Sequence, residues 1–252
     1  MKSLKSRPVW LNHLLKLLAL LALCTLALQG VFALRILMMN IVDPQSSSFQ
    51  RSEAWRLLLD KRQLVWSQDW VPRERISPQL QRAVIASEDD GFLQHRGVDW
   101  DAIEKAWERN QRTTQRSAQR AAPVARAAPP KLVGGSTITQ QLAKNLFLSG
   151  ERTVFRKGQE LLLTLMLETL LSKQRILEIY LNNVEWGEGV FGAQAAARHY
   201  FRVEAAKLGP EQAARLAVML PAPKRFEKNP GSPYVVGRAS TIVARMHGVV
   251  LP

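Results

Sequence analysis

The sequence predicts a mainly α-helical domain behind a single N-terminal transmembrane helix. Residues 17–34 contain 15 apolar residues in 18, and at about 1.5 Å per residue such a helix can cross the hydrocarbon core of a bilayer. Later apolar residues recur mostly at helical spacing, and no strand-like alternation of any length is present. The 252 residues, 46% of them hydrophobic, are enough to form one large packed domain.

The residues before the apolar run set the expected orientation of this anchor. Three of them are basic: Lys2, Lys5 and Arg7. Since such charges stay in the cytoplasm, we expect a cytoplasmic tail over 1–16, a transmembrane helix over 17–39 and the remaining chain on the outer side of the cytoplasmic (inner) membrane. A cleaved signal peptide is the alternative, but the run exceeds a typical h-region and no clean Ala-x-Ala site follows it.

Residues 40–71 are expected to form a linker and a membrane-proximal segment. Asp43 to Ser52 is rich in Pro, Ser and Gln, and an aromatic–aliphatic stretch from Trp55 to Trp70 follows. This stretch could rest on the bilayer or pack on the domain, and the sequence does not distinguish the two. The formal net charge of +14 indicates an anionic partner, which could be nucleic acid, a membrane surface or a phosphorylated substrate.

The stretch richest in candidate chemistry runs from Glu88 to Asp99, after a helix that we expect to begin at Ser77-Pro78 and to stop at Gly91. Glu88 ends this apolar helix. Partial burial and the negative end of the helix dipole disfavour a carboxylate there, so its pKa should rise toward the range of a general base. Taken alone, an acidic cluster at a helix end is more often a solvated loop.

A basic stripe follows on the next predicted helix, Trp100 to Arg109. Its members recur at intervals of 4, 3, 4 and 4: Lys105, Arg109, Arg112, Arg116 and Arg120. They could contact anionic lipid, but no apolar residue continues the stripe beyond Trp107. The Arg/Ala/Pro composition of about residues 113–132 therefore favours a mobile, solvated insertion. We expect no nucleic-acid partner, because the basic run lacks interleaved aromatic residues and the domain lies outside the cytoplasm.

Two further segments bring polar groups onto apolar helices. Gly134-Gly135 opens onto a helix with Ser136 as its expected N-cap, whose free amides suit a phosphate or a sugar oxygen. The helix over Leu161 to Leu171 is apolar around almost its whole circumference and is expected to be buried. Its polar stripe comprises Lys157, Glu160, Thr164 and Glu168. The stripe must face a cleft or find buried partners, and a structural ion-pair network explains it as well as a functional site does.

Three more helices complete the predicted domain. Ser172 caps a helix over Lys173 to Leu181, an Ala-rich helix ends at Tyr200-Phe201, and Pro210 precedes a helix that Pro221 closes. Glycines and asparagines between the first two of these helices predict a tight connection.

Four motifs stand in a fixed order along the chain. They are Glu88-Asp89-x-x-Phe92-x-x-His95-x-Gly97-x-Asp99, Gly135-Ser136-Thr137-Ile138-Thr139-Gln140-Gln141, Arg156-Lys157-x-x-Glu160 and Ser172-Lys173-x-x-Ile176-Leu177-Glu178-x-Tyr180-Leu181-Asn182. Together they resemble the peptidoglycan glycosyltransferases, and in particular the monofunctional biosynthetic peptidoglycan transglycosylases. The resemblance covers about residues 72 to 223. It implies a lysozyme-like, two-lobed helical domain over 72–252, with a long cleft between the lobes.

The resemblance also implies residue roles. Glu88 matches the catalytic base, which takes the proton of the acceptor 4-hydroxyl as that oxygen attacks the anomeric carbon of the lipid-linked chain. Glu160 matches a second essential glutamate beside the departing pyrophosphate. The cations placed around that group are Lys144, Arg152, Arg156 and Lys157. Asp89 and Phe92 would orient Glu88 and shape its pocket. The polar side chains expected to line the cleft are Ser136, Gln140 and Gln141.

The implied reaction polymerises lipid II into β-1,4-linked glycan strands and releases undecaprenyl pyrophosphate. The sequence requires no cofactor and assigns no metal ligand, although a divalent cation (Mg or Mn) could sit at the pyrophosphate. The expected partners are lipid II, the lipid-linked glycan chain, the membrane and other cell-wall synthesis or division proteins. No Ser-x-x-Lys or Lys-Thr/Ser-Gly motif occurs, which indicates an enzyme without a transpeptidase. A lysozyme-like peptidoglycan hydrolase and a non-catalytic membrane scaffold of cell-wall assembly are the alternatives.

Overall fold

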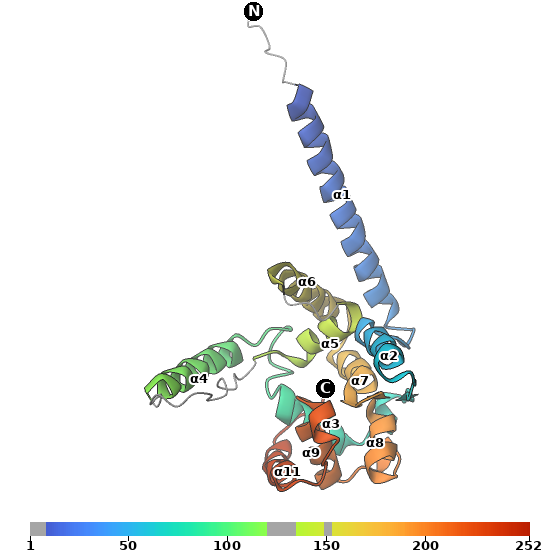
Figure 1. The fold of residues 1–252 in the computed structure, drawn as a ribbon, viewed down its shortest axis with the longest axis vertical. Coiled ribbons are helices and arrows are strands. Elements are labelled where there is room, and N and C mark those ends of the chain that lie inside the picture. Colours follow the sequence, from blue (N-terminus) through green and yellow to red (C-terminus); the bar gives the residue numbers. More distant parts are fainter. Residues whose placement is uncertain (1–8, 120–134, 149–152) are drawn as a thin grey trace, which may run out of the picture.

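The computed structural model describes residues 9–119, 135–148 and 153–252, with the backbone alone for 116–119. Helix α1 (Val9–Met38) projects from one end of a helical domain (Figure 1). It is long and apolar enough to cross a membrane, as predicted. It begins at Val9 rather than at Leu17, because five of the eight residues over 9–16 are apolar and none of them is Gly or Pro, so nothing interrupts the helix. Part of the predicted tail over 1–16 is therefore helical.

The C-terminal third of α1 is docked onto the domain. Ile36 and Met39 are buried, and Gln29 forms a reciprocal amide pair with Gln159 of α6 (Val154–Leu170), with N···O distances of 2.9 and 3.0 Å. Since a lone amide in an apolar environment is costly, the pair holds the two helices together. The C-terminal end of α1 is thus packed against the domain and not joined to it by a flexible linker.

Helix α2 (Ser48–Lys61) occupies much of the segment predicted to be a linker. The expectation of irregular structure over Asp43 to Ser52 is wrong from Ser47 onward, because Ser47 and Gln50 form a capping box that starts the helix. In the aromatic–aliphatic stretch, Leu57 is buried in the domain, whereas Trp55 is 65% exposed. Packing on the domain therefore explains only part of this stretch.

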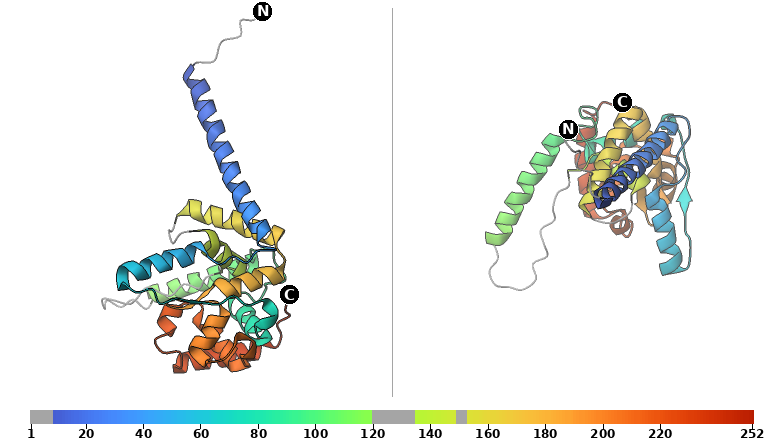
Figure 2. Two further views of the ribbon diagram at one scale, coloured as in Figure 1. Left: turned by 90° about the vertical axis from the view of Figure 1, so that its right-hand side faces the viewer. Right: turned by 90° about the horizontal axis from the view of Figure 1, so that it is seen from above.

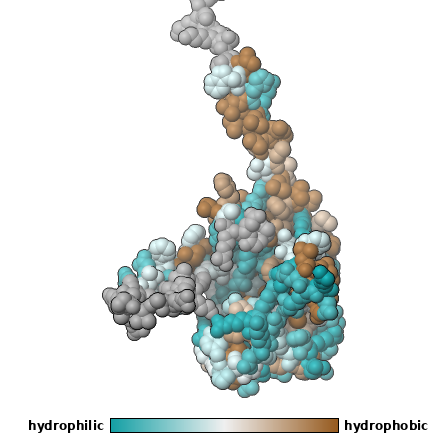
Figure 3. Space-filling view, viewed as in Figure 1, coloured by the Kyte–Doolittle hydropathy of each residue, from teal (hydrophilic) through white to brown (hydrophobic). Residues whose placement is uncertain are grey.

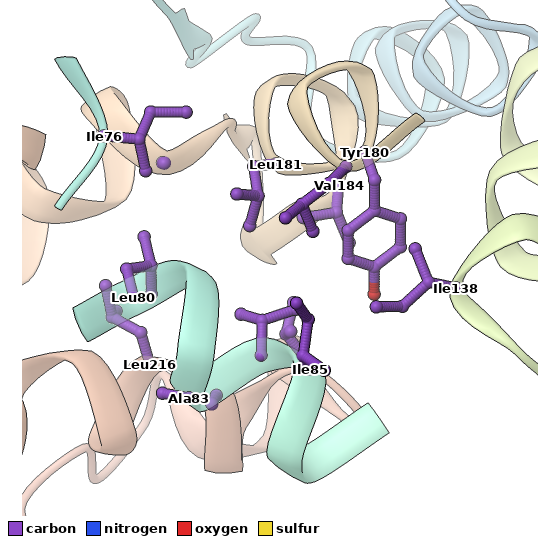
Figure 4. Packing of buried hydrophobic residues seen from close by; sticks show 14 of the residues in the cluster. Ile76, Leu80, Ala83, Ile85, Ile138, Tyr180, Leu181, Val184 and Leu216 are labelled. Carbon is purple, nitrogen blue, oxygen red and sulfur yellow. The ribbon is translucent and has the colours of Figure 1, made fainter. Parts of the chain in front are cut away.

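One group of helices lies farthest from α1 (Figures 1 and 2). It consists of α3 (Pro78–Glu88), α9 (Pro210–Met219) and α11 (Pro233–Met246), which pack on one another. Helix α3 begins as predicted, since Ser77 caps it and Pro78 is its first residue. Its apolar positions point into the core, where Leu80 and Ala83 of α3 lie close to Leu216 of α9 (Figure 4).

A second group lies nearer to α1 and contains α5 (Ile138–Phe147), α6 and α7 (Lys173–Asn183). Helix α5 contacts α6, α7 and α2. Its predicted N-cap, Ser136, is wrong by one residue. The cap is Thr137, whose Oγ1 accepts from the backbone N–H of Gln140 while the side chain of Gln140 reaches back to Thr137 N. This capping box satisfies two amides that Ser136 could not satisfy together.

The prediction that the leucine-rich helix α6 is buried all round is wrong. Leu161, Leu162 and Leu165 are 39%, 46% and 44% exposed. Most of the polar stripe instead turns inward, since Glu160 and Thr164 are buried and Glu168 is half-buried, whereas Lys157 is exposed. Helix α6 lies at the end of the domain from which α1 projects, and Figure 3 shows hydrophobic atoms gathered there and along α1. A helix with polar groups inside and leucines outside suits contact with lipid.

Strands are few and very short in the described residues. They form one three-stranded sheet in the order β1 (Ser67–Gln68), β3 (Val190–Phe191), β2 (Glu185–Gly187). β3 pairs parallel to β1 and antiparallel to β2. Segments of two or three residues are too short to show alternation, so these strands could not be predicted from the sequence, while the mainly α fold is confirmed. The remaining short elements are α8 (Ala193–Phe201), α10 (Pro223–Phe226) and 3-10 turns at Arg73–Arg75 and Ala205–Lys207.

Helix α4 (Trp100–Gln119) projects from the side of the domain (Figure 2). It extends well beyond the predicted end at Arg109 and includes the first residues of the insertion predicted over 113–132. A Glu108–Arg112 pair at 3.3 Å, spaced i,i+4, supports this extension. The rest of the insertion, with Arg120, lies outside the described residues.

Candidate active site

Glu88 is the last residue of α3, and its half-buried side chain faces α5. The Nε2 group of Gln141 donates to Glu88 Oε2 at 2.9 Å. Burial raises the pKa of Glu88 above its usual value; the neighbouring Asp89 adds to this rise, and the hydrogen bond from Gln141 opposes it. The elevated pKa expected from the sequence is therefore confirmed, with desolvation as its main cause.

Asp89 has a different role from Glu88, although the two carboxylates are adjacent. Its buried Oδ2 accepts from the backbone N–H of Ile138 at 2.9 Å, and Oδ1 lies 2.8 Å from Nε2 of His95. Because Nδ1 of His95 accepts from the N–H of Gly97, it is Nε2 that carries a proton and donates to Asp89. Asp89 thus fastens the start of α5 to the end of α3 and orients Glu88 indirectly, through the helix that carries Gln141.

The loop over residues 89–99 lies between the start of α5 and the side of α6. Gly97 has a φ of +88°, and a Cβ at this position would lie 2.6 Å from Cγ2 of Thr164. The hydroxyl of Thr137 donates to Gly97 O at 2.6 Å. The close approach and the left-handed conformation both require glycine here, and together they fix the loop beside Glu88.

Phe92 belongs to this loop and is fully buried, which agrees with a part in shaping the pocket. Nζ of Lys173 lies 4.5 Å above the centre of its ring and also donates to Glu168 Oε1 at 2.9 Å. The same carboxylate oxygen accepts from the hydroxyl of Thr139 at 2.5 Å. Glu168, part of the polar stripe of α6, therefore has buried partners and serves the structure.

A cationic cluster surrounds Glu160, which is 4% exposed. Oε2 of Glu160 accepts from Arg156 at 2.9 Å, and Oε1 accepts from Lys157. Partial burial lowers the pKa of Lys144, the charges of Arg156 and Lys157 lower it further, and Glu160 opposes the shift. The cluster thus brings three cations around one carboxylate and favours an additional anion.

One of the predicted cleft residues has another position. The side chain of Gln140 is buried in the capping box of α5, so it does not line the cleft. Ser136 is exposed just before α5, and its place in the cleft stays a prediction. Arg152 lies outside the described residues. Tyr180 has no predicted role from the sequence, although a tyrosine on the buried face of a helix needs a hydrogen-bond partner for its hydroxyl. That partner is Gln141.

Asp89, His95 and Asp99 place their candidate ligand atoms within 4.8 Å of one another. These groups already have partners, because Asp89 binds Ile138 and His95, while Asp99 Oδ1 accepts from Ala102 N at 2.8 Å. We therefore interpret the group as a hydrogen-bonded brace of the loop. A groove of about 960 Å³ opens beside it, between the loop, α4 and α6.

Comparison with known proteins agrees with this geometry. The sequence model of a family described as Transglycosylase matches residues 59–247. A biosynthetic peptidoglycan transglycosylase of Paraburkholderia xenovorans (strain LB400) is 50% identical over 248 residues, covering 98% of this chain and 97% of that protein. The protein of the same name from Burkholderia pseudomallei (strain K96243) is 52% identical over 227 residues, covering 90% of this chain and 83% of that protein.

Proposed function

The chain belongs to the transglycosylase family and is a peptidoglycan glycosyltransferase that polymerises lipid II, and from this premise we propose that Glu88 is the general base of the transfer. Its helical domain is then the lysozyme-like catalytic domain of that family. Only the transglycosylase family is matched, in accord with a monofunctional enzyme without a transpeptidase.

The proposed step begins at the acceptor sugar. Its 4-hydroxyl oxygen attacks the anomeric carbon of the lipid-linked chain, the bond from that carbon to the pyrophosphate breaks, and the hydroxyl proton passes to Glu88. Gln141 occupies Oε2 of Glu88, whereas no described protein group bonds Oε1, so Oε1 is the oxygen that we expect to accept the proton. The raised pKa of Glu88 makes its carboxylate a stronger base than an exposed glutamate.

The leaving group takes the electron pair of the broken bond as added negative charge on the pyrophosphate. Lys144, Arg156 and Lys157 would stabilise this charge, with Glu160 holding the last two in place. The donors around Glu160 do not fit a metal site held by the protein, because both carboxylate oxygens already accept from cationic side chains. A divalent cation would have to arrive on the pyrophosphate itself.

We further propose that the domain lies on the outer face of the cytoplasmic membrane. The basic residues before α1 support this orientation, and the exposed leucines of α6 support close contact with lipid. A lipid-linked substrate would then reach the cationic cluster without leaving the membrane. A reporter that is active only outside the cytoplasm, fused after Pro252, should give a signal, and activity of a cytoplasmic reporter at the same position would refute the topology.

The observation that carries the assignment is a partly buried glutamate, Glu88, with a raised pKa, combined with three cations around Glu160. A hydrolase has no pyrophosphate leaving group and needs no such cluster, and a scaffold needs neither part. Labelled lipid II incubated with the full-length protein, followed by gel separation, distinguishes the three. Long glycan is the expected product, whereas cleaved glycan would indicate a hydrolase and unchanged lipid II a scaffold.

A further inference from the structure

Tyr180 is a buried residue of α7 whose hydroxyl reaches the surroundings of Glu88. It is 1% exposed, and its ring lies in the core beside Ile138 of α5 (Figure 4). The hydroxyl donates to Oε1 of Gln141 at 2.9 Å, and Nε2 of the same amide donates to Glu88 Oε2 at 2.9 Å. A chain of two hydrogen bonds therefore runs from α7 through α5 to the end of α3.

The polarity of this chain follows from the chemistry of its members. A side-chain amide has one accepting end and one donating end, and in the described residues Gln141 is the only hydrogen-bond partner of the Tyr180 hydroxyl. The pKa of Tyr180 is raised by burial and by the negative charges of Glu88 and Asp89, so the phenol keeps its proton. A protonated phenol without another acceptor donates to the amide oxygen, which turns the amide nitrogen toward Glu88.

We propose that Tyr180 is a positioning residue that holds the Gln141 amide in the orientation that donates to Glu88. The inference rests on the proposed function of Glu88 and adds a residue that acts through another. In the reverse orientation the amide oxygen would face Oε2 of Glu88. That arrangement repels the carboxylate and favours the protonated acid, which cannot serve as the base.

The same geometry predicts a direction for the pH profile. The hydrogen bond from Gln141 lowers the pKa of Glu88 against the rise caused by burial. Loss of a fixed amide orientation should therefore raise the pKa of Glu88 further. The increase of kcat with pH, which follows deprotonation of Glu88, should then begin at a higher pH. It should also leave the Glu88 carboxylate free to rotate, so that Oε1 is no longer held where it accepts the proton. We therefore expect kcat to fall while KM changes little.

The test uses the full-length protein in detergent, with kcat and KM for lipid II measured across pH. Tyr180→Phe keeps the buried ring and removes only the hydroxyl. We expect kcat to fall roughly tenfold, the effect of one hydrogen bond, with KM within about twofold of wild type and the base limb shifted to higher pH. Gln141→Met should produce the same shift, and the double variant should add little, since both changes break one chain.

Tyr200→Phe is the matched control, because its hydroxyl donates to Trp186 O at 2.8 Å, in a different hydrogen bond. It should leave the pH profile unchanged. A wild-type profile for Tyr180→Phe, a loss of rate without a pH shift, or additive effects in the double variant would each overturn the proposal.

A measurement independent of turnover separates this inference from the proposed function. Carbon-13 NMR of labelled glutamate carboxyls should show a higher pKa for Glu88 in Tyr180→Phe and in Gln141→Met, whether or not lipid II is polymerised. An unchanged Glu88 pKa in both variants would overturn the positioning role. If Tyr180→Phe does not fold, Gln141→Met alone still gives the Glu88 pKa and the pH profile of kcat. If both are unchanged in that variant, the proposed chain of hydrogen bonds from Tyr180 to Glu88 is refuted.

Discussion

Replacing Glu88 by Gln removes the proton-accepting carboxylate and keeps the shape of the side chain. The new amide can still present an oxygen to Nε2 of Gln141, which donates to Glu88 Oε2 at 2.9 Å in the wild type. Substrate binding should therefore survive. Turnover should fall by about 10²-fold or more, the usual contribution of a positioned general base.

The same substitution should not weaken the fold at neutral pH. Burial raises the pKa of Glu88 from 4.5, so the folded state binds this proton more tightly than the unfolded chain does. The stability that the wild type draws from this group is complete below about 4.5 and is lost as pH rises through the folded pKa. The glutamine side chain of Glu88→Gln does not titrate, so this variant does not lose that stability as pH rises. Relative to wild type, Glu88→Gln should gain stability as pH rises, by about 1.4 kcal/mol for each unit of pKa elevation.

Two assays check the prediction on the full-length protein. Lipid II polymerisation measures turnover, and thermal unfolding at several pH values measures stability. Glu74→Gln is a suitable control, because the side chain of Glu74 is 73% exposed and should change neither quantity. Polymerisation by Glu88→Gln at close to the normal rate would show that Glu88 is not the base. A stability difference that does not depend on pH would refute the electrostatic reasoning.

Three other substitutions probe separate parts of the structure. Alanine in the left-handed backbone conformation costs ~1 kcal/mol, and Gly97→Ala should destabilise the protein by more than this, because its Cβ would lie 2.9 Å from Cγ of Glu168. An unchanged melting temperature would contradict the close approach. Burial raises the pKa of Glu185 to about 7, so wild-type stability should decline between pH 4.5 and 7 and Glu185→Gln should remove that part of the decline; identical pH–stability curves would contradict it. Glu160→Gln should reduce lipid II turnover and alter the response to added Mg²⁺, whereas Glu88→Gln should leave that response unchanged; equal metal responses would count against separate roles.

Local features of the chain were predictable from the residues themselves. The start of α3 follows from Ser77-Pro78, and the raised pKa of Glu88 follows from its place at the end of an apolar helix. The span of α1 follows from its composition. Each of these depends on neighbours a few residues apart, whose geometry a helix already fixes.

Which residues contact each other across the fold was not predictable in this way. Gln140 and Gln141 are adjacent and chemically identical, yet one caps α5 and the other binds Glu88. Successive helical residues point about 100° apart, and the placement of α5 at the end of α3, fixed by the bond from Ile138 N–H to Asp89, determines which one faces the carboxylate. Tyr180 has a part in the site only because α7 packs on α5.

The composition of this chain determined a mainly helical protein with an N-terminal helix long and apolar enough to cross a membrane, and the ordered motifs indicated its family. Only the tertiary structure decided which way α6 faces. A helix of leucines with one polar stripe can bury either surface, and the choice depends on what surrounds it. Here Glu168 of the polar stripe bonds Thr139 and Lys173, Glu160 and Thr164 are buried, and the leucines stay exposed on the opposite side, where a bilayer can replace water as their solvent.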